Sequence, residues 1–166
     1  EADIKQMTQL THFDEQGASR MVDVGNKEIT DRIAIAHAKV IMKTETFNLI
    51  MDRKVQKGDV LEVARVAGIM AAKQTFTLIP MCHPLNLTSV KIDYGNNAVN
   101  EIDIFSEVRV TGKTGVEMEA ITAATICAIT IYDMCKSVDK GMVISDIHLI
   151  KKSGGKSGTF VFGKDT

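Results

Sequence analysis

Aromatic residues and net charge are both in short supply in this 166-residue sequence. Tryptophan is absent, aromatic residues make up 5% of the chain, and 20 basic against 21 acidic residues leave a formal net charge of −1. RNA-recognition domains stack bases on aromatic side chains of their sheets, and nucleic-acid-binding proteins generally present a positive field. The sequence therefore predicts no nucleic-acid partner, and any basic site must be local.

Cysteine is scarce as well, with three residues and no C-x-x-C pair. An odd number without such a pair argues against a disulfide framework and against a tetrathiolate zinc site, and it fits a reducing cytosol. Cys127 and Cys135 lie about 12 Å apart along a presumed helix, beyond disulfide reach, so both are expected to be small packing residues. The four histidines are scattered without metal-ligand spacing, so no metal site is predicted.

A signal for secretion is not visible, because the opening residues EADIKQMTQL have neither a basic stretch nor an apolar core. The apolar run at 120–132 is shorter than the roughly 20 residues that cross a bilayer, which predicts a core helix and no membrane association. We therefore expect a cytoplasmic protein. Residues 1–20 are polar and without period, which predicts a loosely ordered arm, and residues 21–166 are expected to form a single domain.

The hydrophobic pattern changes between a period of two and a helical period along the chain. The resulting element order is β-α-β-β-α-β with one brief extra helix. This order predicts an α+β, ferredoxin-like (split βαβ) fold, in which helices pack on one face of an antiparallel sheet. The predicted strands cover 32–42, 86–95, 98–112 and 142–152, the predicted helices cover 44–50, 59–79 and 116–140, and short extended pieces are expected at 21–24 and 159–163.

The helix predicted at 116–140 is apolar on nearly all sides but carries charges near both ends. Asp133 and Lys136 are three apart and therefore neighbours on a helix. Two interpretations fit this spacing equally well. The residues form either an ordinary ion pair at a helix end or an acid–base pair at the edge of a cleft. Glu117 and Glu119 suit the positive end of the helix dipole, and because they are two apart, at most one of them should face a given site.

The only two prolines, Pro80 and Pro84, flank the sequence Met-Cys-His. Prolines stiffen a loop, and a stiff loop can hold an imidazole still, so His83 is a candidate for catalysis as well as for a structural role. Cys82 is a weaker candidate for a nucleophile, because the helix ahead of it directs its negative end toward the thiol.

Lysines combine with glycines in two candidate anion sites. The segment TGKTG at 111–115 lacks the full P-loop pattern but precedes a helix, so an anion-binding turn remains possible. The segment KKSGGKSG at 151–158 fits a phosphate cradle or a solvated loop. Lys57 lies in another loop, and Lys73 lies on an otherwise apolar helix, where a lysine on the buried side needs an anion. Together these features indicate a small anionic ligand beside groups that transfer protons.

Seven blocks occur in the order MVDV, KGDV, AGIMAAK, IPMCHPL, TGKTGVEMEA, TIYDMCK and KSGGKSG. Across residues 20–160 this set resembles the molybdenum cofactor biosynthesis protein C family, the cyclic pyranopterin monophosphate synthases. The resemblance implies a lyase that converts a cyclised dihydro-GTP, still bearing its triphosphate, into cyclic pyranopterin monophosphate and pyrophosphate. It implies no metal or organic cofactor. It also implies a homo-oligomer, a hexamer built as a trimer of dimers, with active sites between subunits.

The resemblance also implies roles for individual residues. Asp133, Lys136 and Lys57 become the catalytic candidates, and desolvation is expected to lower the pKa of Lys136 so that it can move protons. The helix between Glu119 and Asp133 would be about 21 Å long, so its two ends serve one site only if different subunits contribute them. The residues expected to bind substrate are Met81, Cys82, His83, Glu117, Met118, Glu119, Lys73, Lys152 and Lys156.

A second interpretation is a non-catalytic ferredoxin-like module that binds a nucleotide and regulates a partner, since this fold hosts both kinds of protein. Turnover separates the two interpretations. If Asp133→Asn and Lys136→Ala left turnover intact while ligand affinity fell, the enzyme interpretation would be wrong.

Overall fold

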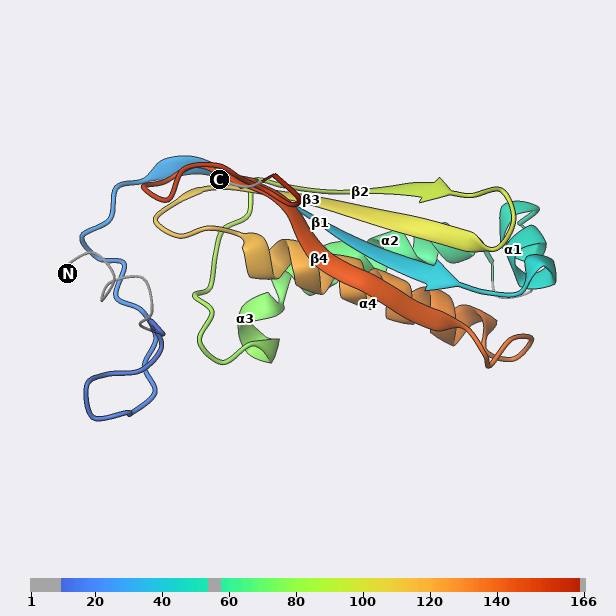
Figure 1. Ribbon diagram of the computed structural model, residues 1–166, viewed down its shortest axis with the longest axis horizontal. Helices are drawn as coiled ribbons and strands as arrows, with labels where there is room; N and C mark the ends of the chain where they lie inside the picture. The colour runs from blue at the N-terminus through green and yellow to red at the C-terminus, as the bar shows by residue number, and fades with distance from the viewer. Residues whose placement is uncertain (1–9, 54–57, 165–166) are drawn as a thin grey trace.

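The chain forms an antiparallel five-stranded sheet, and helices cover one face of it (Figure 1). This computed structural model describes residues 10–53 and 58–164. The strand order is β2-β3-β1-β4-β5, which confirms the predicted α+β, ferredoxin-like arrangement. The elements are β1 (Thr30–Ile41), α1 (Thr44–Met51), α2 (Val60–Lys73), α3 (Thr75–Leu78), β2 (Ser89–Asn96), β3 (Glu101–Gly112), α4 (Glu117–Cys135), β4 (Val143–Ser153) and β5 (Phe160–Val161).

Small residues let the central helix approach the sheet and its neighbour closely. Ala34, Ala36 and Ala38 on β1 are completely buried, and α4 presents a row of buried alanines of its own. A Cβ atom at Gly68 of α2 would lie 3.0 Å from the carbonyl oxygen of Ala123, so only glycine allows α2 and α4 to cross at this distance. The core is therefore built on short side chains at the helix contacts and on branched ones within the sheet.

Three sequence predictions about elements are wrong in detail. The helix predicted at 59–79 is two helices, because Gln74 leaves helical geometry and the Thr75 hydroxyl donates to the carbonyl oxygen of Ala71 at 3.0 Å. Residues 21–24 belong to no strand. The helix predicted at 116–140 ends at Cys135, after which the buried carboxylate of Asp139 accepts hydrogen bonds from two backbone N–H groups and turns the chain.

Helix α4 runs along the covered face of the sheet (Figure 1). It is 19 residues long and apolar enough to cross a membrane by length and composition alone, but half of that stretch is buried within the domain. The prediction of a core helix is therefore confirmed. Residues 10–20 of the N-terminal arm and the loop before α4 lie at one end of this helix, and α1 lies at the other (Figure 1). The two groups of predicted site residues are therefore separated by the helix.

Candidate active site

The N-terminal end of α4 carries two carboxyl groups in different surroundings. Glu119 is only 4% exposed, and burial raises its pKa to about 7. Glu117 is more open, and its Oε1 lies 3.0 Å from the ammonium nitrogen of Lys152 on β4. The expectation that at most one of the two faces a given site is not met, since both line the same cavity. A carboxyl group with a pKa near 7 can give or take a proton at neutral pH.

The loop between α3 and β2 places an imidazole opposite these carboxyl groups. His83 Nε2 lies 2.7 Å from the carbonyl oxygen of Val22, which can only accept a hydrogen bond. The bond assigns the Nε2–H tautomer and leaves Nδ1 to accept a proton. In the same loop, burial and then the nearby Glu119 carboxylate raise the pKa of Cys82, which disfavours the thiolate.

A cavity of about 330 Å³ joins these groups to the N-terminal arm. The arm turns sharply here, because Asp14 Oδ1 accepts hydrogen bonds from the N–H groups of Gln16 and Ala18. Thr11 and His12 line the cavity from the arm, and the sequence analysis did not single them out as site residues. Six of the predicted substrate-binding residues line this cavity: Met81, Cys82, His83, Glu117, Met118 and Glu119.

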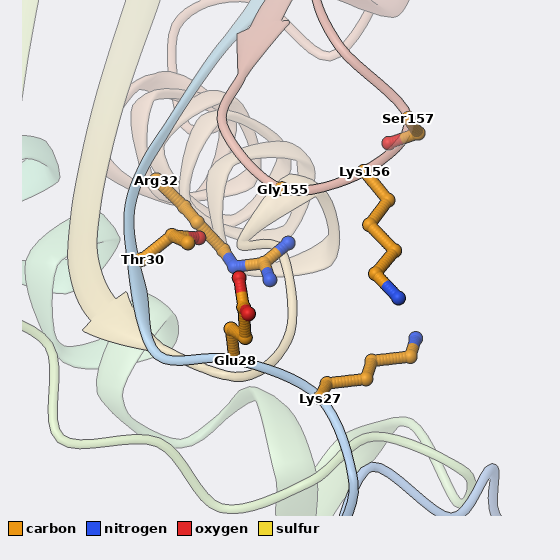
Figure 2. Close-up of a pocket in the computed structure, with 7 residues that line it drawn as sticks. All are labelled: Lys27, Glu28, Thr30, Arg32, Gly155, Lys156 and Ser157. Carbon is orange, nitrogen blue, oxygen red and sulfur yellow. The ribbon is translucent and has the colours of Figure 1, made fainter.

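A second cavity, of about 420 Å³, lies between the start of β1 and the glycine-rich loop after β4. Figure 2 shows the ammonium groups of Lys27 and Lys156 pointing toward one another, with the guanidinium group of Arg32 nearby and Glu28 beside it. Three cations face one carboxylate among the lining residues. Such a concentration of positive charge is relieved by an anion with several oxygen atoms.

Arg32 also holds the two glycine-rich segments in place. Its Nε donates to the carbonyl oxygen of Gly112 at 3.0 Å and its Nη2 to that of Lys113 at 3.2 Å. Gly155, with a φ of +74°, packs against the guanidinium group, where a Cβ atom would collide. The hydroxyl of Thr30 is buried in the wall of this cavity and has no hydrogen-bond partner among the described residues.

Lys27 lines both cavities, so the two adjoin at this residue. Neither Lys27 nor Arg32 was a predicted site residue. Lys27 follows the block MVDV by three positions, and Arg32 begins the first predicted strand. Neither residue belongs to a motif whose spacing indicates a binding site. Of the two predicted lysines of the glycine-rich loop, Lys156 lines the basic cavity, whereas Lys152 pairs with Glu117 and donates to Ser157 at 2.9 Å.

Asp133 and Lys136 lie at the opposite end of α4 and line neither cavity. Their side chains are 59% and 52% exposed and form an ion pair of 2.5 Å. The hydrogen bond with Asp133 raises the pKa of Lys136, so the expectation of a lowered pKa is wrong for the single chain. Lys73 is exposed rather than on the buried side of its helix. Lys57 lies outside the described residues.

The fold and the two cavities define a class of protein: a ferredoxin-like domain with a cation-rich cavity beside groups that can perform acid–base chemistry. A family model of the MoaC family matches residues 21–155. The chain belongs to the MoaC family.

Three relatives illustrate how far the similarity extends. The chain is 58% identical over 156 residues to a protein of Desulforapulum autotrophicum, an alignment that covers 93% of this chain and 96% of the relative. It is 60% identical over 153 residues to one of Syntrophomonas wolfei, covering 92% and 98%. It is 52% identical over 156 residues to one of Brevibacillus brevis, covering 94% and 98%. Each of these relatives is named a cyclic pyranopterin monophosphate synthase.

Proposed function

We propose that the two adjoining cavities form the substrate site of a cyclic pyranopterin monophosphate synthase, a lyase that acts on a cyclised dihydro-GTP bearing a triphosphate. The observation that carries the proposal is the position of Lys27, which joins a cation-rich cavity to one that holds a buried carboxyl group and an imidazole. A substrate derived from a nucleotide needs both, because its phosphates require cations and its rings require proton transfer. The high identity to enzymes of this name supports the assignment.

The basic cavity is assigned to the triphosphate. To close a cyclic phosphate, a hydroxyl oxygen of the substrate bonds to the α-phosphorus while the bond from that phosphorus to pyrophosphate breaks. The hydroxyl proton passes to a base, and pyrophosphate departs with additional negative charge. Lys27, Arg32 and Lys156 are placed to neutralise that charge.

The cavity with Glu119 and His83 is assigned to the rings of the substrate. Opening and rebuilding rings requires protons to move on and off nitrogen and carbon. Glu119, with a pKa of about 7, can act in either direction near neutral pH. His83 offers Nδ1 as a proton acceptor, because Val22 fixes the hydrogen on Nε2.

Asp133, Lys136 and Lys57 complete the catalytic set in this proposal, within one catalytic domain of residues 21–166. About 21 Å of helix separates Glu119 from Asp133, so a second copy of the chain must bring Asp133 and Lys136 to the cavities. Lys73 and Lys152 are assigned to substrate binding. The proposed assembly is a cytoplasmic hexamer, a trimer of dimers, and a variant that cannot associate is expected to be inactive.

Incubation with the cyclised dihydro-GTP tests the function directly. The expected products are pyrophosphate and a pterin that carries a cyclic phosphate, measured by a coupled phosphate assay and by mass spectrometry. Absence of both products, with and without magnesium, would contradict the proposed activity. Binding of the substrate without turnover would instead support the regulatory module.

Replacing Lys156 by alanine is expected to raise KM for the substrate about 10- to 150-fold, because a hydrogen bond to a charged phosphate contributes about 1.5–3 kcal/mol. The loss should shrink at high salt, since exposed charges are screened. Steady-state kinetics at two ionic strengths measures both effects. Lys91→Ala is the matched control, because Lys91 is exposed, lies on strand β2 and pairs with Asp93 at 2.7 Å. An equal change in KM for both variants would remove Lys156 from the phosphate site.

A further inference from the structure

The N-terminal arm forms a small hairpin, although its sequence has no strand pattern. Phe13 and Ser19 form an antiparallel bridge, and the N–H group of Arg20 donates to the carbonyl oxygen of His12 at 2.8 Å. We call residues 12–20 the arm hairpin. His12 lies at its base, where the two sides of the hairpin pair, so the position of this residue depends on the hairpin as a whole.

One aspartate closes the turn of the arm hairpin. Asp14 Oδ1 accepts hydrogen bonds from the N–H groups of Gln16 and Ala18 at 3.0 and 2.8 Å. The carbonyl oxygen of Asp14 accepts another from the N–H group of Gly17 at 3.0 Å, and Gly17 has a φ of +82°, which suits glycine. Asp14 is two residues from His12, so the turn that it closes also sets the position of His12.

Two further hydrogen bonds hold the segment after the arm hairpin against the rest of the domain. The carbonyl oxygen of Val22 accepts one from His83 Nε2 at 2.7 Å, and that of Gly25 accepts one from the Lys113 ammonium group at 2.6 Å. His83 lies in the loop between α3 and β2, and Lys113 lies in the loop before α4. The arm hairpin is therefore held beside the N-terminal end of α4 (Figure 1).

The arm supplies one wall of the cavity that is assigned to the substrate rings. Val22 and Val24 give this wall apolar surface, and its polar side chains are Thr11, His12 and, at the junction with the basic cavity, Lys27. In the part of the chain that the structure describes, the imidazole of His12 has no hydrogen-bond or ion-pair partner. Ligand cavities are mostly apolar, and the few polar groups in their walls fix the orientation of the ligand.

We propose that His12 is a further substrate-binding residue, whose imidazole forms a hydrogen bond with the rings of the substrate, and that Asp14 is a positioning residue that acts through it. The inference rests on the proposed function for the identity of the ligand. An imidazole has both a donor and an acceptor nitrogen, and rings derived from guanine offer N–H and carbonyl groups to either. Because the phosphates occupy the basic cavity, His12 recognises the rings and not the phosphates.

Two ligands separate a ring contact from a phosphate contact. Calorimetry in a Glu119→Gln parent, which consumes substrate slowly, measures binding of the cyclised dihydro-GTP and of inorganic triphosphate. Adding His12→Ala should weaken binding of the cyclised dihydro-GTP about 2- to 12-fold, the effect of one lost hydrogen bond, and leave triphosphate binding unchanged. Adding Lys156→Ala should weaken both. Gln16→Ala is the matched control, because this exposed residue of the arm hairpin lines neither cavity and should change neither affinity.

A double-mutant cycle tests the role of Asp14. Asp14→Ala alone should weaken binding of the cyclised dihydro-GTP as His12→Ala does, and it should cause little further loss when His12 is already alanine, because Asp14 acts through His12. Losses that simply add would overturn the positioning role.

Two results would overturn the role of His12 alone: unchanged binding of the cyclised dihydro-GTP by His12→Ala, or an equal loss for both ligands. If the parent bound triphosphate but not the cyclised dihydro-GTP, the proposed function itself would fail, and this inference with it.

Discussion

Glu119→Gln is expected to lower kcat by about 10²–10⁴-fold, the range for loss of a general acid or base. The glutamine side chain keeps the size and one hydrogen-bonding oxygen of the carboxyl group, so the cavity should keep its shape. What is lost is the exchangeable proton of a group whose pKa lies at about 7. Single-turnover kinetics with the cyclised dihydro-GTP measures the step, with substrate affinity determined separately.

The pH dependence of stability provides a second measurement of the same residue. Burial raises the pKa of Glu119 from 4.5 to about 7, so the folded protein binds this proton more tightly than the unfolded chain does. The resulting stability is fully present below about pH 4.5 and is lost as the pH rises through 7. Relative to the unchanged protein, Glu119→Gln should gain about 2–3 kcal/mol between pH 5 and pH 8, measured by urea unfolding.

Glu117→Gln is the matched control, because Glu117 lines the same cavity but is paired with Lys152 and is more exposed. It should affect kcat less and should not abolish the fall in stability between pH 5 and pH 8, because Glu119 keeps its buried carboxyl group. If both variants lose activity equally and neither alters the pH dependence, Glu119 is not the titrating group.

The sequence predicted the fold well because the pattern that specifies it is local. Apolar residues alternate along β1 and recur at helical spacing along α4, because one side of each element is buried. The sequence of that element alone shows this pattern. The break at Gln74 was missed because it depends on a threonine hydroxyl that binds a carbonyl oxygen of the preceding turn, and residue types do not reveal that choice.

Site residues that lie in recognisable sequence blocks were predicted. Site residues that reach the cavities only through the tertiary structure were missed. The segments around Cys82 and Glu119 were predicted as separate candidates and meet in one cavity. Arg32 was missed because its role depends on contacts about 80 positions along the chain, at Gly112 and Lys113. His12 lies in an arm with no periodic pattern, so only the folded chain shows that it lines the cavity.

Lys136→Ala should reduce kcat by about 10²–10⁴-fold even though its side chain is half exposed and far from both cavities in a single chain. The effect follows from the proposal that a second copy brings this ammonium group to the substrate. Lys136→Arg should not recover full turnover, because a guanidinium group keeps the charge but does not release its proton. Full activity of Lys136→Ala would show that the exposed pair with Asp133 is only a helix-end ion pair.

Mixing two inactive variants separates a shared site from a local one. Random pairing of Lys136→Ala with Glu119→Gln makes half of the dimers mixed, and each mixed dimer contains one site with both residues intact. About a quarter of the full activity should therefore return. Glu119→Gln mixed with His83→Asn is the control, because both changes fall in the half of the site that one chain supplies, so no mixed dimer contains an intact site. If activity returns in the first mixture and not in the second, each active site draws its two halves from different chains. If activity returns in neither mixture, each site lies within one chain.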